Sequence, residues 1–242
     1  MKKNFQFSVF NFQFISVLVV LALAAFLRLF RIADYMTFLG DEGRDVLRVY
    51  EILHGKLTLL GPTSSVGGFF LGPVYYYFMA PFLWLFNYNP VGPAVMVALI
   101  GVATVFLIYK FSKDLFNYKV GLIAAIIYAI SPLVVAYSRS SWNPNPLPFF
   151  SLLTLYTIYK AIEKKSLKYY FASGFFLGIA MQLHYLAIFL GVIIFLYVFV
   201  LEFLTKFSFK EKLPLVKKYI FIILGFLIGW FRFLAFEFSH GF

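Results

Sequence analysis

Residues 169–201, YYFASGFFLGIAMQLHYLAIFLGVIIFLYVFVL, contain no Asp, Glu, Lys or Arg. A single helix over the apolar run 169–203 would reach about 50 Å, well beyond a bilayer core of roughly 30 Å. Two shorter helices that turn near 182–185, QLHY, fit such a core much better. This stretch therefore predicts a helical membrane protein with closely connected spans.

The rest of the chain has a similar composition. Of its 242 residues, 62% are hydrophobic and 13% are charged, whereas charged residues make up about 25% of a soluble domain. Further charge-free runs cover 4–27, 57–109, 120–138 and 140–159. The runs are continuously apolar rather than alternating, so we expect an all-α polytopic membrane protein and no barrel. The chain has no cysteine, which excludes disulfides and thiolate metal sites.

Lysines separate the apolar runs and indicate how the chain is oriented. They cluster at 2–3, 110–119, 160–168 and 206–218, and the positive-inside rule places all four clusters in the cytoplasm. An even number of crossings must then lie between neighbouring clusters. This parity predicts about seven transmembrane helices, near 12–31, 91–109, 119–137, 146–160, 169–203 (two helices) and 216–236. The chain would be an integral, multi-pass protein of the cell membrane.

Two segments are expected to be external juxtamembrane helices that do not cross the bilayer. Segment 70–87, FLGPVYYYFMAPFLWLFN, is short, contains two prolines and is rich in Tyr and Trp, which favour the membrane interface. Segment 41–54 has apolar residues at helical spacing and ends before Gly55. Its expected apolar face consists of Val46, Val49, Tyr50 and Leu53.

Lysines and arginines are distributed unequally between the two sides of the membrane, and Lys56 is the one lysine expected on the external side. On this topology the presumed cytoplasmic cations are lysines, and the arginines are external: Arg28, Arg31, Arg44, Arg48, Arg139 and Arg232. Guanidinium groups are suited to bidentate binding of phosphate and carboxylate. The net charge of +11 thus reflects orientation signals and an external arginine group, and we expect no nucleic-acid partner.

The stretch FLGDEGRDVLRVYEILHG, residues 38–55, interrupts the apolar sequence with acids and arginines. One interpretation is local, because acids suit the first turn of a helix and nearby arginines pair with them. The other is catalytic. Asp41, next to the first span, would be a base for a water-borne hydroxyl, and arginines would hold a phosphate leaving group. Local chemistry leaves both interpretations open.

An ordered series of motifs resembles the GT-C membrane glycosyltransferases. It consists of RLFRI (28–32), GDEGRD (40–45), GPVYYYFMAPFLWLF (72–86), YSRSSWNPNPLPFF (137–150), MQLHY (181–185) and FEFSHGF (236–242). The series is most similar to the branch of protein O-mannosyltransferases and lipid A aminoarabinose transferases. The resemblance implies that residues 1–242 form a single transmembrane module with the charged loop outside. It also implies that the C-terminal part of the family is missing.

The resemblance further implies a transferase that moves a sugar from a polyprenyl- or dolichyl-phosphate carrier to an external acceptor, with inversion. Asp41 matches the family's proposed general base. The expected substrate-binding residues are Glu42, Arg44, Lys56, Arg139 and His184. The expected partners are the lipid-linked donor and membrane lipids, and the acceptor is left open. No cofactor or metal is expected, because Asn143 and Asn145 stand where some relatives have an acid and the histidines are dispersed.

A rival interpretation is a transporter or flippase for lipid-linked or anionic substrates. Transporters place ionisable residues and broken helices near the bilayer midplane. In this chain the ionisable residues lie at the outer ends of the predicted spans, which favours surface chemistry over passage. A third interpretation is an inactive fragment, because members of the resembled family continue beyond the seventh span.

Overall fold

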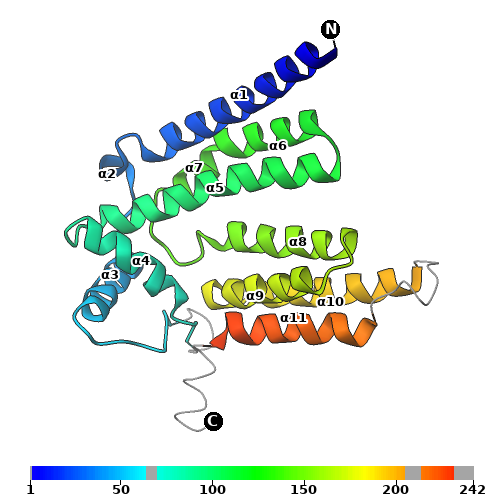
Figure 1. Ribbon diagram of the computed structural model, residues 1–242. Helices are drawn as coiled ribbons and strands as arrows, with labels where there is room; N and C mark the ends of the chain where they lie inside the picture. Colours follow the sequence, from blue (N-terminus) through cyan, green and yellow to red (C-terminus); the bar gives the residue numbers. More distant parts are fainter. Residues whose placement is uncertain (1, 64–69, 205–213, 232–242) are drawn as a thin grey trace. The chain divides into compact units, whose positions relative to one another are not determined.

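The computed structural model describes residues 2–63, 70–204 and 214–231, and the regular elements in these ranges are all helices. The all-α prediction is therefore confirmed for this part of the chain (Figure 1). The helices are α1 Lys2–Leu29, α2 Ile32–Tyr35, α3 Gly40–Leu53, α4 Val74–Leu85, α5 Val91–Leu115, α6 Tyr118–Ile130, α7 Pro132–Tyr137, α8 Leu147–Glu163, α9 Leu167–Leu183, α10 Ala187–Leu204 and α11 Leu215–Gly229. The motif FEFSHGF, Arg232 and the lysines at 206, 210 and 212 lie outside the described residues.

The helix boundaries follow the predicted segments closely, with one interruption. Helices α9 and α10 are separated at 184–186, as the length argument predicts, and α3 ends just before Gly55, whose φ is +91°. The predicted span 119–137 is broken into α6 and α7 at Ser131. Pro132 is the first residue of α7, and proline cannot continue the preceding helix because it lacks a backbone N–H.

Two described helices are long and apolar enough to cross a membrane, Phe12–Leu29 within α1 and Val91–Leu115, which is α5. Helices α4, α6 and α10 are also apolar, but their apolar stretches are shorter than those of α1 and α5. With 12 residues, α4 is about 18 Å long, less than a bilayer core of about 30 Å. The exposed side chains of α10 are large and apolar, as expected for contact with lipid: Ile188, Phe189, Val192, Ile193, Phe195, Leu196, Tyr197, Phe199 and Val200.

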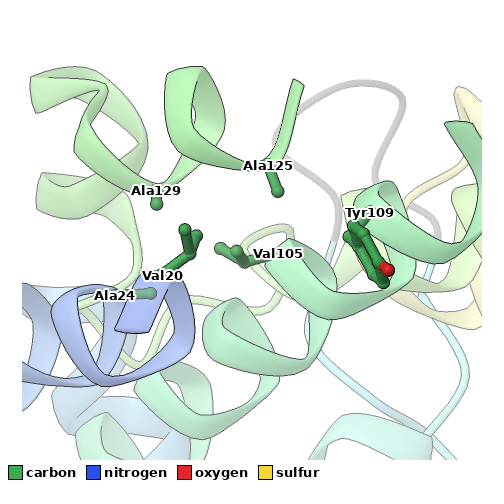
Figure 2. Close-up of a cluster of buried hydrophobic side chains, with 6 residues drawn as sticks. All are labelled: Val20, Ala24, Val105, Tyr109, Ala125 and Ala129. Carbon is green, nitrogen blue, oxygen red and sulfur yellow. The ribbon is translucent and has the colours of Figure 1, made fainter. Parts of the chain in front are cut away.

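The described chain divides into two compact units, Met1–Leu47 with Pro81–Asn145, and Arg48–Ala80 with Pro146–Phe242. In the first unit α1 packs against α5 and α6, which lie side by side (Figure 1). Small side chains at the contact allow the helices to approach closely. Figure 2 shows this cluster, which consists of Val20, Ala24, Val105, Tyr109, Ala125 and Ala129.

Arg28 joins the ends of two helices of the first unit. Its side chain is fully buried, and its Nη1 donates to the carbonyl oxygens of Ala24 at 3.2 Å and Ala129 at 3.0 Å. Its Nη2 donates to the Tyr128 carbonyl at 3.4 Å. The last carbonyls of a helix have no partner within it, and a cation there is stabilising. This arginine therefore has a structural role.

In the second unit α9 packs between α8 and α11. Two glycines of α9, Gly174 and Gly178, face α11, where the second pair is Gly225 and Gly229. A Cβ at Gly174 would overlap the Ile222 carbonyl, and Cβ atoms at the other three positions would also meet backbone of the facing helix. The two glycine pairs therefore bring the helix backbones into direct contact, as small residues do in membrane helix pairs.

Gln182, near the end of α9, ties together three segments of the second unit. Its side chain is buried, with 3% exposed. Its Oε1 accepts from the Val74 N–H at 3.2 Å, and its Nε2 donates to the Gly229 carbonyl at 2.6 Å. One amide thus joins the first residue of α4 to the last residue of α11, and holds the start of α4 in place.

Candidate active site

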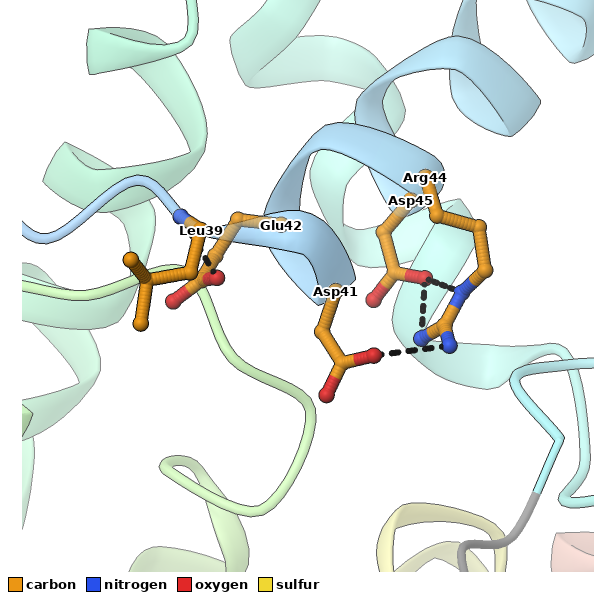
Figure 3. A network of polar contacts seen from close by, with 5 residues as sticks. All are labelled: Leu39, Asp41, Glu42, Arg44 and Asp45. Carbon is orange, nitrogen blue, oxygen red and sulfur yellow. Dashed lines mark hydrogen bonds and ion pairs between the residues drawn. The ribbon is translucent and has the colours of Figure 1, made fainter.

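The charged stretch begins helix α3, and Glu42 defines that beginning. Its Oε2 accepts a hydrogen bond from the Leu39 N–H at 3.0 Å, just before the helix starts at Gly40 (Figure 3). A glutamate in the first turn that reaches back to the preceding backbone N–H is half of a capping box. The acid thus satisfies one of the N–H groups that every helix start leaves without an internal partner.

The second carboxylate oxygen of Glu42 reaches a loop far away in sequence. Its Oε1 accepts from the Ser140 hydroxyl at 2.7 Å. Both side chains are buried, with 4% of Glu42 and 5% of Ser140 exposed. Because both of its oxygens are bound to protein, Glu42 holds the loop after α7 against the start of α3. Whether Glu42 also contacts a substrate, as predicted from the sequence, stays a prediction.

Asp41 has a different environment from its neighbour. Its Oδ1 accepts from Arg44 Nη1 at 2.9 Å, and 53% of its side chain is exposed. Arg44 also binds Asp45 Oδ1, from Nε at 2.9 Å and from Nη2 at 2.8 Å, so one guanidinium bridges two acids (Figure 3). Within the described ranges Asp41 Oδ2 has no hydrogen-bond partner. The Asp41 carboxylate is therefore oriented by one oxygen and open at the other.

The buried face of α3 differs from the predicted apolar face. Val49 is fully buried as expected, but 45% of Tyr50 is exposed. The residues with less than a tenth of their surface exposed are Glu42, Asp45, Val49 and Ile52. Burial of an acid is tolerated when hydrogen bonds and ion pairs satisfy it. Hydrophobic spacing alone could not locate this face, because two of its four members are acids with partners elsewhere.

A cavity of about 550 Å³ lies beside the first turn of α3. Its walls come from two segments of the first unit, the residues around the start of α3 and the end of α7 with the loop that follows. The lining residues are Thr37, Leu39, Gly40, Asp41, Glu42, Ala136, Tyr137, Ser140 and Trp142. Asp41 and Glu42 are the ionisable acids of this wall, and Asp41 is the exposed one.

Arg139 stands between two lining residues in sequence, but its side chain binds the end of α1. The guanidinium donates to the Leu27 carbonyl from Nε at 3.0 Å and again from Nη2. It also reaches the Phe30 carbonyl at 3.4 Å, and its Cζ lies 5.2 Å from the centre of the Tyr35 ring. As with Arg28, a cation stabilises the free carbonyls of a helix end. Its partners are neutral oxygens, so its positive charge is retained.

Lys56 and His184 belong to the second unit. Lys56 is 73% exposed and forms a loose ion pair with Glu51 at 3.6 Å. His184 follows the last residue of α9, and its Nδ1 accepts from the Leu186 N–H at 3.3 Å. Burial lowers the pKa of His184, and since a protonated Nδ1 could not accept this bond, the neutral ring leaves Nε2–H as the donor.

Three residues that line the cavity were not predicted from the sequence. Ser140, Tyr137 and Trp142 all lie in the motif YSRSSWNPNPLPFF, but within it only Arg139 was singled out as a ligand. A serine gives no composition signal, and its importance comes from the buried bond to Glu42. Among the residues that the structure describes, no group of three or more His, Asp or Glu side chains is arranged to hold a metal ion.

An apolar helical chain with a carboxylate-lined cavity beside one of its charged helices fits the class of membrane-associated glycosyltransferases. Comparison with known families makes the identification specific. A family model described as dolichyl-phosphate-mannose-protein mannosyltransferase matches residues 71–230, so the chain belongs to this family. The resemblance noted in the sequence is thus confirmed. The match includes the loop with Ser140 and Trp142 and begins after α3, which carries Asp41.

Two curated relatives come from Bacillus subtilis (strain 168) and carry the name "Putative mannosyltransferase", YycA and YkcB. The chain is 24% identical to YycA over 158 residues, which is 65% of the chain and 23% of the relative. It is 35% identical to YkcB over 82 residues, 34% of the chain and 12% of the relative. The chain thus spans less than a quarter of the length of either relative.

Proposed function

We propose that this chain carries the site of a membrane glycosyltransferase that moves a sugar from a polyprenyl- or dolichyl-phosphate carrier to a hydroxyl acceptor on the external face. The observation that carries the proposal is the open Asp41 carboxylate in the wall of a cavity. Membership of a mannosyltransferase family supports the reaction class. Asp41 lies in the first turn of α3, and Arg139 follows the end of α7. Ionisable groups at helix ends fit a reaction at the membrane surface better than passage through the bilayer.

The proposed reaction uses Asp41 as the general base. The acceptor hydroxyl gives its proton to Oδ2, while Arg44 holds Oδ1 at 2.9 Å and fixes the direction of the carboxylate. The acceptor oxygen forms a bond to the anomeric carbon as the bond from that carbon to the phosphate oxygen breaks. The polyprenyl phosphate leaves from the opposite side of the sugar, so the configuration inverts.

A cation is needed to stabilise the negative charge of the leaving phosphate. The candidate arginines differ in whether a neighbouring carboxylate already balances their charge. Arg44 is shared between the carboxylates of Asp41 and Asp45. Arg139 binds carbonyl oxygens and keeps its full charge, so we assign it the phosphate. Lys56, which is largely exposed, and the Nε2–H of His184 are proposed as further contacts with the anionic donor.

We further propose that residues 1–242 form one transmembrane module with about seven spans and the charged loop outside. The lysine clusters between apolar runs support this orientation. The short length of α4 supports its assignment as a helix that does not cross the bilayer. The apolar exposed surfaces of α1 and α10 support lipid contact.

The proposed topology can be tested by cysteine labelling, because the chain has no cysteine of its own. Single cysteines at Lys56 and Asn89 should react with a membrane-impermeant thiol reagent added to intact cells. Cysteines at Lys113 and Lys164, two exposed cytoplasmic positions on the proposed topology, should react only after lysis. Labelling of the residue-113 cysteine from outside, or protection of the residue-56 cysteine, would refute the arrangement.

The activity itself is testable with the purified chain in sealed vesicles. A radiolabelled sugar on polyprenyl phosphate should be transferred to an acceptor, or to water as a slow substitute, and the product should have the inverted anomeric configuration. Vesicles without protein are the blank. Movement of the intact lipid-linked sugar between leaflets, with no transfer, would instead identify a flippase.

A further inference from the structure

We infer that Ser140 is a positioning residue for the reaction. Through the buried Glu42 carboxylate it fixes the first turn of α3, and with that turn the direction of Asp41. The inference rests on the proposed function, in which Asp41 is the base, and adds to it a residue that acts without touching the substrate. It follows from the composition of the first turn of α3, from the bond that holds this turn, and from the contacts that hold Ser140.

The first turn of α3 has few contacts of its own. Two of its four residues are glycines, Gly40 and Gly43, and glycine is a poor helix former because its backbone is the most flexible. Beyond its own helix and its chain neighbours, no atom lies within 4 Å of where a Cβ at Gly40 would stand. In the described stretch 37–43, Glu42 is the one buried residue. The turn that carries Asp41 is therefore attached to the rest of its unit through Glu42.

Glu42 has two hydrogen bonds, and the one to Ser140 is the one that leaves the helix start. The bond from the Leu39 N–H to Oε2 closes the turn on itself. The Ser140 hydroxyl donates to Oε1 at 2.7 Å from a loop 98 positions away. A hydrogen bond to a carboxylate is stronger than one between neutral groups, and burial strengthens it further. Asp41 is the adjacent residue of the same turn (Figure 3), so a shift of Glu42 moves the Asp41 backbone with it.

Ser140 can serve as a fixed point because the loop around it is itself held. Its carbonyl oxygen accepts from Asn145 Nδ2 at 2.8 Å. The preceding residue, Arg139, donates from Nε to the Leu27 carbonyl of α1 at 3.0 Å. Ser140 itself is buried. The serine therefore connects the start of α3 to a loop that is bound to α1.

Arg44 and Ser140 orient different parts of the base. Arg44 holds Asp41 Oδ1 at 2.9 Å and directs the side chain, whereas Ser140 fixes the backbone from which that side chain extends. Loss of the Ser140 hydroxyl leaves a buried Glu42 oxygen without this donor, which favours a turn displaced toward water. Displacement of a catalytic group by about 1 Å costs up to about a hundredfold in rate. Such a change acts on the chemical step, so it lowers kcat and leaves KM nearly unchanged.

The first measurement does not depend on catalysis. Hydrogen–deuterium exchange of the backbone amides of residues 39–43 reports how firmly the turn is held, because the Leu39 N–H is itself bonded to Glu42. We expect Ser140→Ala to speed this exchange at least about tenfold while exchange in α5 stays as in the parent chain. Ser140→Thr, which keeps a hydroxyl, should exchange at close to the parent rate. Unchanged exchange in Ser140→Ala would overturn the inference.

The second measurement compares sugar transfer in the same variants. Ser140→Ala should lower kcat at least about tenfold with KM within about twofold of the parent value, and Ser140→Thr should restore kcat. Ser138→Ala is the matched control. Ser138 is also buried, but its hydroxyl donates to the Val134 carbonyl, four positions earlier, rather than to α3. This control should leave both exchange and kcat unchanged.

Asp41→Asn shows whether Ser140 acts through the base. In that background, loss of the Ser140 hydroxyl should lower the residual rate no further, whereas a direct effect of Ser140 on the substrate would persist. A further fall of about tenfold in the double variant, or a normal kcat in Ser140→Ala, would overturn the inference and leave the proposed function standing. If the parent chain transfers no sugar, the proposed function fails, and the exchange result alone decides whether Ser140 holds the turn.

Discussion

Asp41→Asn lowers the rate of sugar transfer by at least about a hundredfold while the protein stays folded, if this carboxylate is the base. Asparagine has the same size and keeps an oxygen for the bond from Arg44, and the bond that caps α3 is made by Glu42 and stays intact. The lost ion pair is half exposed, with 53% of the Asp41 side chain accessible, so it contributes at most about 1 kcal/mol to stability. Transfer from labelled polyprenyl phosphate and a thermal unfolding curve measure the two effects.

Asp34→Asn is the matched control for this experiment. Asp34 pairs with Arg31 at 2.7 Å, also at a spacing of three residues, and 54% of its side chain is exposed. Asp45→Asn would be a poor control, because Asp45 is fully buried against Arg44 and its replacement disturbs folding. If Asp41→Asn and Asp34→Asn transfer sugar equally well, Asp41 is only an acid at a helix start, as the local interpretation of the stretch holds.

Gly174→Ala is the substitution expected to damage the fold most. A Cβ at this position would overlap the Ile222 carbonyl of α11, and backbone cannot move aside as the end of a side chain can. Overpacking of this kind costs about 3 kcal/mol, and more where the helices must separate. For a chain of this length that corresponds to a Tm lowered by roughly 6–12 °C. Circular dichroism of the detergent-solubilised protein measures it.

Gly191→Ala, on α10, tests the same chemical change without the clash. An added Cβ there would meet only the Leu177 side chain at 3.4 Å, an ordinary contact. Alanine is also the better helix former by about 1 kcal/mol, so this variant should be as stable as the parent chain. A similar Tm for both variants would show that the glycine contact between α9 and α11 is not tight.

Much of the architecture was available from the sequence. Within the described residues, the apolar segments predicted as spans appear as helices, and the turn at QLHY and the glycine after α3 lie at helix ends. These features are local, since helix formation, length and termination depend on neighbouring residues and on the thickness of the bilayer. The order of the motifs was sufficient to indicate the family, which the match over residues 71–230 confirms.

The candidate site could be predicted only in part. Asp41 was chosen for its position and chemistry, and the structure places it in the wall of a cavity, although its catalytic role stays a prediction. The pattern could not show that Glu42 would have both oxygens bound, or that Arg139 would face the end of α1. Each of these contacts depends on which residue the fold places next to the side chain. A sequence pattern does not contain that information, because the partners are about 100 residues away along the chain.

By itself, the sequence determined that this chain is apolar, helical over its described residues and divided by clusters of lysines, because helix formation and hydrophobic spacing depend on residues close together in the chain. Tertiary structure alone decided the environments of two adjacent acids. Glu42 is bound by Ser140, 98 positions along the chain, whereas Asp41 keeps one oxygen open. The physical reason is that a buried polar group must find its partner wherever packing brings one, and packing joins segments whose separation in sequence no local pattern records.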